Sequence, residues 1–173
     1  VFLPILIDIQ MKKRIIYIIM FFMTVLLIFV CQKPLFMLYN SAAEKGAVFG
    51  DYLQVMWHGL SLDAAVCGYL VAVPFLVTLI SVWFHKIPLR KLLLPYYAVI
   101  ALLVAVVFVV DMGLYPFWGF KLDASVFLYL DSPEEALASV SVGFLIIRVL
   151  LMLVLSVLLA WLMLKVTPRK VKV

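Results

Sequence analysis

Four long apolar runs, separated by polar segments, dominate the pattern of this sequence. We predict membrane-spanning helices over residues 15–39, 60–84, 92–110 and 142–164. In the first run, the stretch from Ile15 to Cys31 alone would rise about 26 Å as a helix, close to the ~30 Å hydrocarbon core of a bilayer. Apolar residues resume after Gln32-Lys33-Pro34, so we expect this helix to run on to Tyr39 with Lys33 snorkelling to the interface.

Two shorter helices are expected between the spans. Asp51 is suited to cap a short amphipathic helix over residues 52–57, before the second span. In the loop before the fourth span, Ser132 can cap a helix that has Pro133 in its first position and Glu134 and Glu135 at the positive end of its dipole. The predicted fold class is all-α: a polytopic membrane protein with one transmembrane domain over residues 1–173.

Small residues recur at helical spacing within two of the spans. A stripe of this kind lets another helix approach closely. We therefore expect helix contacts on two faces, the first formed by Ala64, Gly68 and Ala72 and the second by Ala98, Ala101 and Ala105.

The composition supports a membrane location. Hydrophobic residues make up 68% of the chain and charged residues 13%, which excludes an ordinary soluble domain. The net charge of +5 comes from short basic clusters beside the apolar runs, and not from a basic stripe, so we expect no nucleic-acid binding.

The basic clusters also predict the topology. With four spans, most of the 14 lysines and arginines fall on one side of the membrane: Lys12, Lys13, Arg14, Lys86, Arg90, Lys91, Lys165, Arg169, Lys170 and Lys172. The positive-inside rule then places both termini in the cytoplasm and the loop over residues 111–136 outside. Met11-Lys-Lys-Arg resembles a natural start, so translation from Met11 and from Val1 are both open, and we expect the first span to be an uncleaved anchor.

Charges inside the predicted spans are the candidate functional residues. Asp63 and Arg148 lie at matching depth with opposite sign, and we expect them to pair, because a lone charge in hydrocarbon costs at least ~2.5–3.5 kcal/mol. The pair could only fix helix packing. Alternatively, it could mark a site for an anionic lipid head group, with Arg148 and Lys121 meeting the phosphate.

The remaining residue types give no catalytic signal. Tyr115, Phe117, Trp118 and Phe120 fit an interfacial aromatic belt, or a clamp for a lipid or a second domain. His58 and His85 lie at opposite membrane faces, and Cys31 and Cys67 lie within spans, so no metal site is expected. The sequence contains no nucleophile motif and no phosphate-binding glycine loop.

Several short segments nevertheless resemble one family. They are Tyr39-Asn40, Gly50-Asp-Tyr-Leu-Gln54, His58-Gly-Leu-Ser-Leu-Asp63, Asp111-Met-Gly-Leu-Tyr115, Gly119-Phe-Lys-Leu-Asp123 and Tyr129-Leu-Asp-Ser-Pro-Glu-Glu-Ala136. In order and placement they resemble the start of the lipoteichoic acid synthase-like membrane proteins of the sulfatase superfamily, over roughly residues 14–165.

The resemblance implies a membrane bundle, usually of five spans, that precedes an extracytoplasmic catalytic domain of alkaline-phosphatase-like fold. In that family the catalytic domain carries a divalent metal ion and transfers phosphoglycerol or a related group, or hydrolyses a sulfate or phosphate ester. The sequence in hand ends after four spans, so we expect the fifth span and the catalytic domain to be absent. No catalytic or metal residue carries over, and only Asp63, Asp111, Tyr115 and Asp123 match the membrane-domain patterns.

The resemblance therefore implies an anchor in the bacterial cytoplasmic membrane, with membrane lipids and an extracytoplasmic domain as its partners. We expect no cofactor in this chain itself. The alternative is a free-standing small membrane protein, either a transporter or an accessory subunit. The third span has no polar residue beyond its ends, which counts against a transporter.

Overall fold

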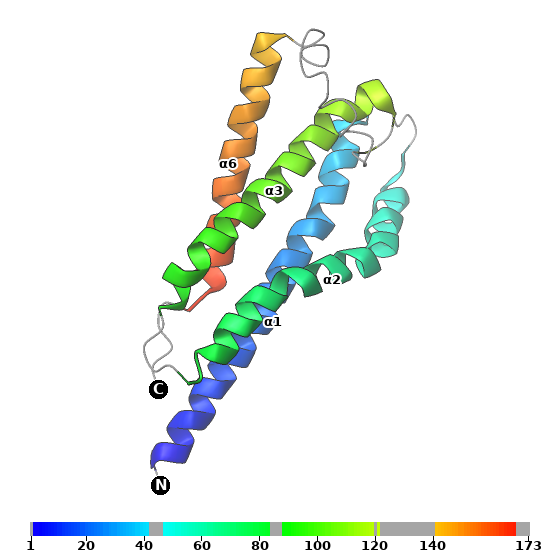
Figure 1. The fold of residues 1–173 in the computed structure, drawn as a ribbon. Helices are drawn as coiled ribbons and strands as arrows, with labels where there is room; N and C mark the ends of the chain where they lie inside the picture. Colours follow the sequence, from blue (N-terminus) through cyan, green and yellow to red (C-terminus); the bar gives the residue numbers. More distant parts are fainter. Residues whose placement is uncertain (1, 42–46, 84–87, 120, 122–140, 169–173) are drawn as a thin grey trace.

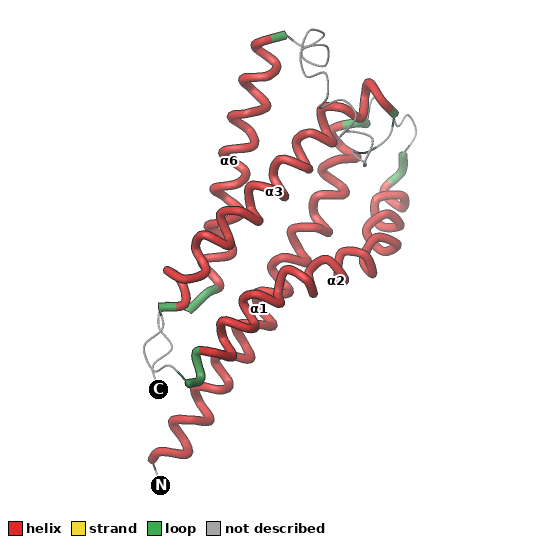
Figure 2. Tube along the Cα trace, in the orientation of Figure 1, coloured by secondary structure: helices red, strands yellow, loops and turns green. Residues whose placement is uncertain are grey.

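Four long helices make up almost all of the structure, a computed structural model that describes residues 2–41, 47–83, 88–119, 121 and 141–168 (Figure 2). The helices are α1 (Phe2–Tyr39), α2 (Phe49–Ile80), α3 (Leu89–Trp118) and α6 (Val142–Val166) (Figure 1). All four are long and apolar enough to cross a membrane. The prediction of an all-helical, multi-pass membrane protein is therefore confirmed.

Three helices begin or end beyond the predicted spans. α1 begins at Phe2 and not at residue 15, and α2 begins at Phe49 and not at residue 60. α3 runs to Trp118, so residues 111–118, which we expected in the outer loop, are helical. Residues 52–57 do not form a separate short helix, because α2 begins at Phe49 and continues through them into the span. The N-cap is Val48 and not Asp51 as predicted. Asp51 lies in the first turn, where its carboxylate accepts a hydrogen bond from the Val48 amide at 2.8 Å. The expected extension of α1 to Tyr39 is confirmed. The helix expected to start at Ser132 lies outside the described residues.

The helices alternate in direction and associate mainly as two pairs, α1 with α2 and α3 with α6 (Figure 1). We call the two ends of the bundle the Arg14 end and the Tyr39 end. The Arg14 end holds the start of the α1 span, the end of α2, the start of α3 and the end of α6. The Tyr39 end holds the opposite termini of the same helices.

The best-buried core lies toward the Arg14 end. It comprises Tyr17, Phe21, Val25, Cys67, Val71, Leu93, Tyr97 and Met163, which come from all four helices. Within it the hydroxyls of Tyr17 and Tyr97 lie 2.6 Å apart, and that of Tyr97 lies 3.0 Å from Thr167 Oγ1. Nearby, Arg14 donates to the Ser81 carbonyl at 3.0 Å. The buried hydroxyls are thus paired where the two helix pairs meet, whereas the buried Nε atom of Arg14 has no hydrogen-bond partner among the described residues.

Only one of the two expected small-residue contacts is present. Ala101 and Ala105 are fully buried beside Leu159 of α6, although Ala98 is exposed. The prediction that the small residues of α2 form a helix contact is wrong, because Gly68 and Ala72 are exposed. The buried face of α2 is offset by about one residue and consists of Asp63, Cys67, Val71, Pro74 and Thr78. Since a charge within a span needs a protein partner, turning Asp63 inward turns the small residues outward.

Candidate functional site

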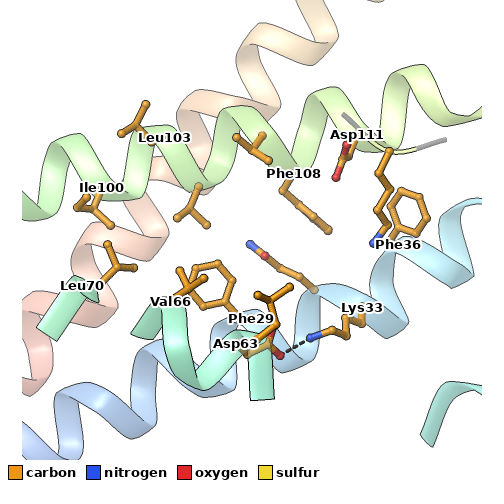
Figure 3. Close-up of a pocket in the computed structure, with 15 residues that line it drawn as sticks. Phe29, Lys33, Phe36, Asp63, Val66, Leu70, Ile100, Leu103, Phe108 and Asp111 are labelled. Carbon is orange, nitrogen blue, oxygen red and sulfur yellow. Dashed lines mark hydrogen bonds and ion pairs between the residues drawn. The ribbon is translucent and has the colours of Figure 1, made fainter. Parts of the chain in front are cut away.

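A cavity of about 460 Å³ lies between α1, α2 and α3 in the half of the bundle near the Tyr39 end (Figure 3). Residues of three helices and Lys121 thus enclose a space large enough for a small molecule. Its lining combines charged and amide groups with aliphatic and aromatic ones: Phe29, Gln32, Lys33, Phe36, Leu62, Asp63, Val66, Leu70, Ile100, Leu103, Val104, Val107, Phe108, Asp111 and Lys121. A volume of this size is typical of small-molecule sites, which span about 300–1,000 Å³.

An ion pair between α1 and α2 forms one side of the cavity. The Lys33 ammonium donates to the Asp63 carboxylate (Figure 3), and the two side chains are 16% and 11% exposed. Gly59, one turn before Asp63, makes this approach feasible, because a Cβ there would collide with the end of the Lys33 side chain. Each charge therefore has the partner that a low-dielectric setting demands.

The expected pairing of Asp63 with Arg148 is wrong. Asp63 lies on α2, which packs mainly against α1, whereas Arg148 lies on α6, which packs mainly against α3. Equal depth in the membrane therefore did not bring these two side chains together. Lys33, which we expected to snorkel, is the partner of Asp63.

Arg148 instead connects α6 to the end of α1. It donates to the Tyr39 hydroxyl, and its guanidinium carbon lies 5.1 Å from the centre of the Tyr39 ring and 4.6 Å from that of Phe144. The guanidinium passes over α3 at Gly113, where a Cβ would be 3.7 Å from Arg148 Nε. Both rings favour a cation at this position. Arg148 does not line the cavity.

Two further predicted site residues, Asp111 and Lys121, do line the cavity. The Lys121 ammonium lies 4.4 Å from the centre of the Phe36 ring. Tyr115 packs edge-on against the same ring, with centroids 4.9 Å apart. Of the predicted site residues, Asp63, Asp111 and Lys121 thus line the cavity, and Tyr115 packs against its lining residue Phe36. Asp123 lies outside the described residues.

Lys33, Gln32 and Phe36 line the cavity but were not predicted as site residues. A signal for Lys33 was present, because Lys33 and Asp63 are charges within consecutive spans and both lie near the same end. Phe36 carries no such signal, since an aromatic residue in a membrane helix is unremarkable by composition. Among the described residues, no three His, Cys, Asp or Glu side chains come close enough to hold a metal ion.

The lining of the cavity, with charged side chains beside apolar ones, is suited to binding a molecule that has both charged and apolar parts.

No protein-family model, curated protein or solved structure matches the chain.

Proposed function

We propose that this chain is the membrane-anchoring domain of a phosphoglycerol- or phosphoethanolamine-transferase-like or sulfatase-like enzyme. It would position an extracytoplasmic catalytic domain at the lipid surface of the bacterial cytoplasmic membrane. The nucleophile and the divalent metal would belong to that domain, and this chain alone would not catalyse the reaction. Four apolar helices of membrane-crossing length supply the anchor.

The observation that carries the proposal is where the resembling segments lie. Tyr39 is the last residue of α1, and the segments over 50–54 and 58–63 fall in the first half of α2. The segment over 111–115 falls in the last turns of α3. All four therefore gather at the Tyr39 end (Figure 1). Segments that share one membrane face are suited to hold a domain that works at that face.

The charge distribution supports the orientation that the proposal needs. Among the described residues, six basic side chains lie at the Arg14 end: Lys12, Lys13, Arg14, Arg90, Lys91 and Lys165. The Tyr39 end holds three, Lys33, Lys121 and Arg148, together with the carboxylates of Asp51, Asp63 and Asp111. By the positive-inside rule the Arg14 end faces the cytoplasm and the Tyr39 end faces outward. A catalytic domain at the Tyr39 end would then be extracytoplasmic.

The proposal is tested by purifying the affinity-tagged protein from its native membranes after treating intact cells with a membrane-impermeant cross-linker. The preparation is then assayed for transfer of phosphoglycerol or phosphoethanolamine from a phospholipid, and for release of sulfate from an ester. We expect a metal-dependent, alkaline-phosphatase-like domain, either continuous with the chain or cross-linked to it. We also expect an activity that EDTA abolishes. A chain that is isolated with no such domain and no such activity contradicts the proposal and favours a small transporter or accessory subunit.

A further inference from the structure

The cavity is divided into a charged part and an apolar part. The charged part is nearer the Tyr39 end, where Asp111 and Lys121 join the Lys33–Asp63 ion pair. The apolar part extends toward the middle of the bundle, between Val66 and Leu70 of α2 and Ile100 and Leu103 of α3 (Figure 3). Val107 of α3 also lines the cavity. A molecule that fills both parts is an amphiphile whose polar group points toward the Tyr39 end.

The cavity is open to the surroundings of the bundle on the side between α2 and α3. α2 packs mainly against α1, and α3 packs mainly against α6, so α2 and α3 have few contacts with each other. Three lining residues on this side are largely exposed: Leu62 at 70%, Leu103 at 55% and Val107 at 48%. In a membrane, such apolar surface faces hydrocarbon chains. A lipid can therefore enter sideways, without first leaving the bilayer.

The charged part selects the polar group of that lipid. Lysine is a common phosphate ligand and acts there as a point charge. The Lys121 ammonium lies at the exposed rim over the Phe36 ring, whereas the Lys33 ammonium is deeper and already bound by Asp63. Lys121 is thus the cation that an entering phosphate meets first.

We propose that the cavity binds one phospholipid from the leaflet at the Tyr39 end. One acyl chain lies between α2 and α3, and the phosphate binds Lys121. The Lys33–Asp63 pair closes the side against α1 and limits how far the phosphate descends. The inference rests on the proposed function in one respect: that function makes this leaflet the extracytoplasmic one, next to the catalytic domain.

The test measures lipid binding to the purified full chain by native mass spectrometry from detergent. The added probes are phosphatidylglycerol, phosphatidylethanolamine and diacylglycerol, with inorganic phosphate as a soluble competitor. We expect one equivalent of either phospholipid to bind, and diacylglycerol to bind about tenfold more weakly, as the loss of a charged hydrogen bond implies. Millimolar inorganic phosphate should not displace the phospholipid.

Two matched pairs of variants locate the bound lipid. Leu103→Trp fills the apolar part and should abolish binding, whereas Leu102→Trp, on an exposed neighbour that does not line the cavity, should leave it unchanged. Lys121→Ala should weaken binding about tenfold. Lys91→Ala, which removes an exposed lysine at the Arg14 end, should not weaken it.

Several results would overturn the inference. Diacylglycerol that binds as well as phospholipid removes the role of the phosphate, and displacement by inorganic phosphate indicates a site for a soluble anion. Unchanged binding to Leu103→Trp places the lipid elsewhere. If the purified protein carries a catalytic domain but binds no phospholipid, only this inference is overturned. Retained lipid binding in a protein with no such domain overturns only the proposed function.

Discussion

The Lys33 ammonium on α1 binds the Asp63 carboxylate on α2, within the membrane-crossing part of both helices. Pairing removes the cost that either charge would have alone in hydrocarbon. It also fixes the rotation of α2, since the face with Asp63 is the face that α2 buries. The pair thus links a helix contact to the shape of the cavity beside it.

Removing one member of this pair should destabilise the bundle more than removing both. Asp63→Asn leaves the Lys33 ammonium without its carboxylate and should lower the free energy of unfolding by about 2 kcal/mol. This is less than for a fully buried pair, because both side chains are partly exposed. Lys33→Met combined with Asp63→Leu should recover most of this loss. The measurement is thermal unfolding in detergent, and the single variants Asp63→Leu and Lys33→Met complete a double-mutant cycle with the double variant.

A second double-mutant cycle, with Arg148 in place of Lys33, separates the observed partner of Asp63 from the one that the sequence predicted. The coupling energy of Asp63 with Lys33 should exceed about 1 kcal/mol, and that of Asp63 with Arg148 should be near zero. A charge exchange between positions 63 and 148 should therefore rescue nothing. Strong coupling between Asp63 and Arg148 would contradict the structure.

Gly59 gives an independent test of the ion pair. Gly59→Ala should displace the end of the Lys33 side chain from Asp63 and destabilise the bundle, even though alanine favours helix. Gly68→Ala on the same helix is the matched control, because no atom lies within 4 Å of its added Cβ. The control should be neutral or stabilising by up to ~1 kcal/mol. Equal midpoints of thermal unfolding for the two variants would show that position 59 has no special constraint.

The contact of Arg148 with α1 should depend on an aromatic ring at position 39 as well as on the hydroxyl. Tyr39→Phe removes the acceptor but keeps the ring, so it should cost less than Tyr39→Leu, with a difference of about 0.5–1 kcal/mol. The unfolding midpoint in detergent measures both. If Phe and Leu at this position are equivalent, the ring does not hold the guanidinium.

The hydroxyl chain at the Arg14 end predicts an order of effects. Among the residues that the structure describes, the Tyr97 hydroxyl bonds both Tyr17 and Thr167, whereas the Tyr17 hydroxyl bonds Tyr97 alone. Tyr97→Phe should therefore destabilise by about 2 kcal/mol and Tyr17→Phe by about 1 kcal/mol. Unfolding midpoints in the reverse order would show that the hydroxyls are not shared in this way.

The sequence was sufficient to predict the elements that hydrophobicity controls. The four spans follow from length and apolar character alone, and so does the extension of α1 past Pro34 to Tyr39. The charges of Asp63 and Arg148 were correctly expected to find partners. Their identity was not predictable from depth, because depth does not say which helices are neighbours.

The rotation of each helix was equally hard to predict. On α2, the predicted contact face and the observed buried face differ by one position, which is about 100° around a helix. The predicted face held positions 64, 68 and 72, and the buried one holds 63, 67 and 71. Phe36 was missed for a related reason: its importance lies in its contacts with Lys121 and Tyr115, which are far away in the chain.

The central claim, that the Tyr39 end faces outward to hold a catalytic domain, is tested most directly by thiol labelling of intact cells with a membrane-impermeant maleimide. In a variant with Cys31 and Cys67 replaced by alanine, single cysteines are placed at Val48, 64% exposed near the Tyr39 end, and at Pro88, exposed at the Arg14 end. If the Tyr39 end faces outward, the cysteine at position 48 is labelled in intact cells, and the cysteine at position 88 is labelled only after the membrane is permeabilised. Labelling of position 88 but not 48 in intact cells would contradict the claim.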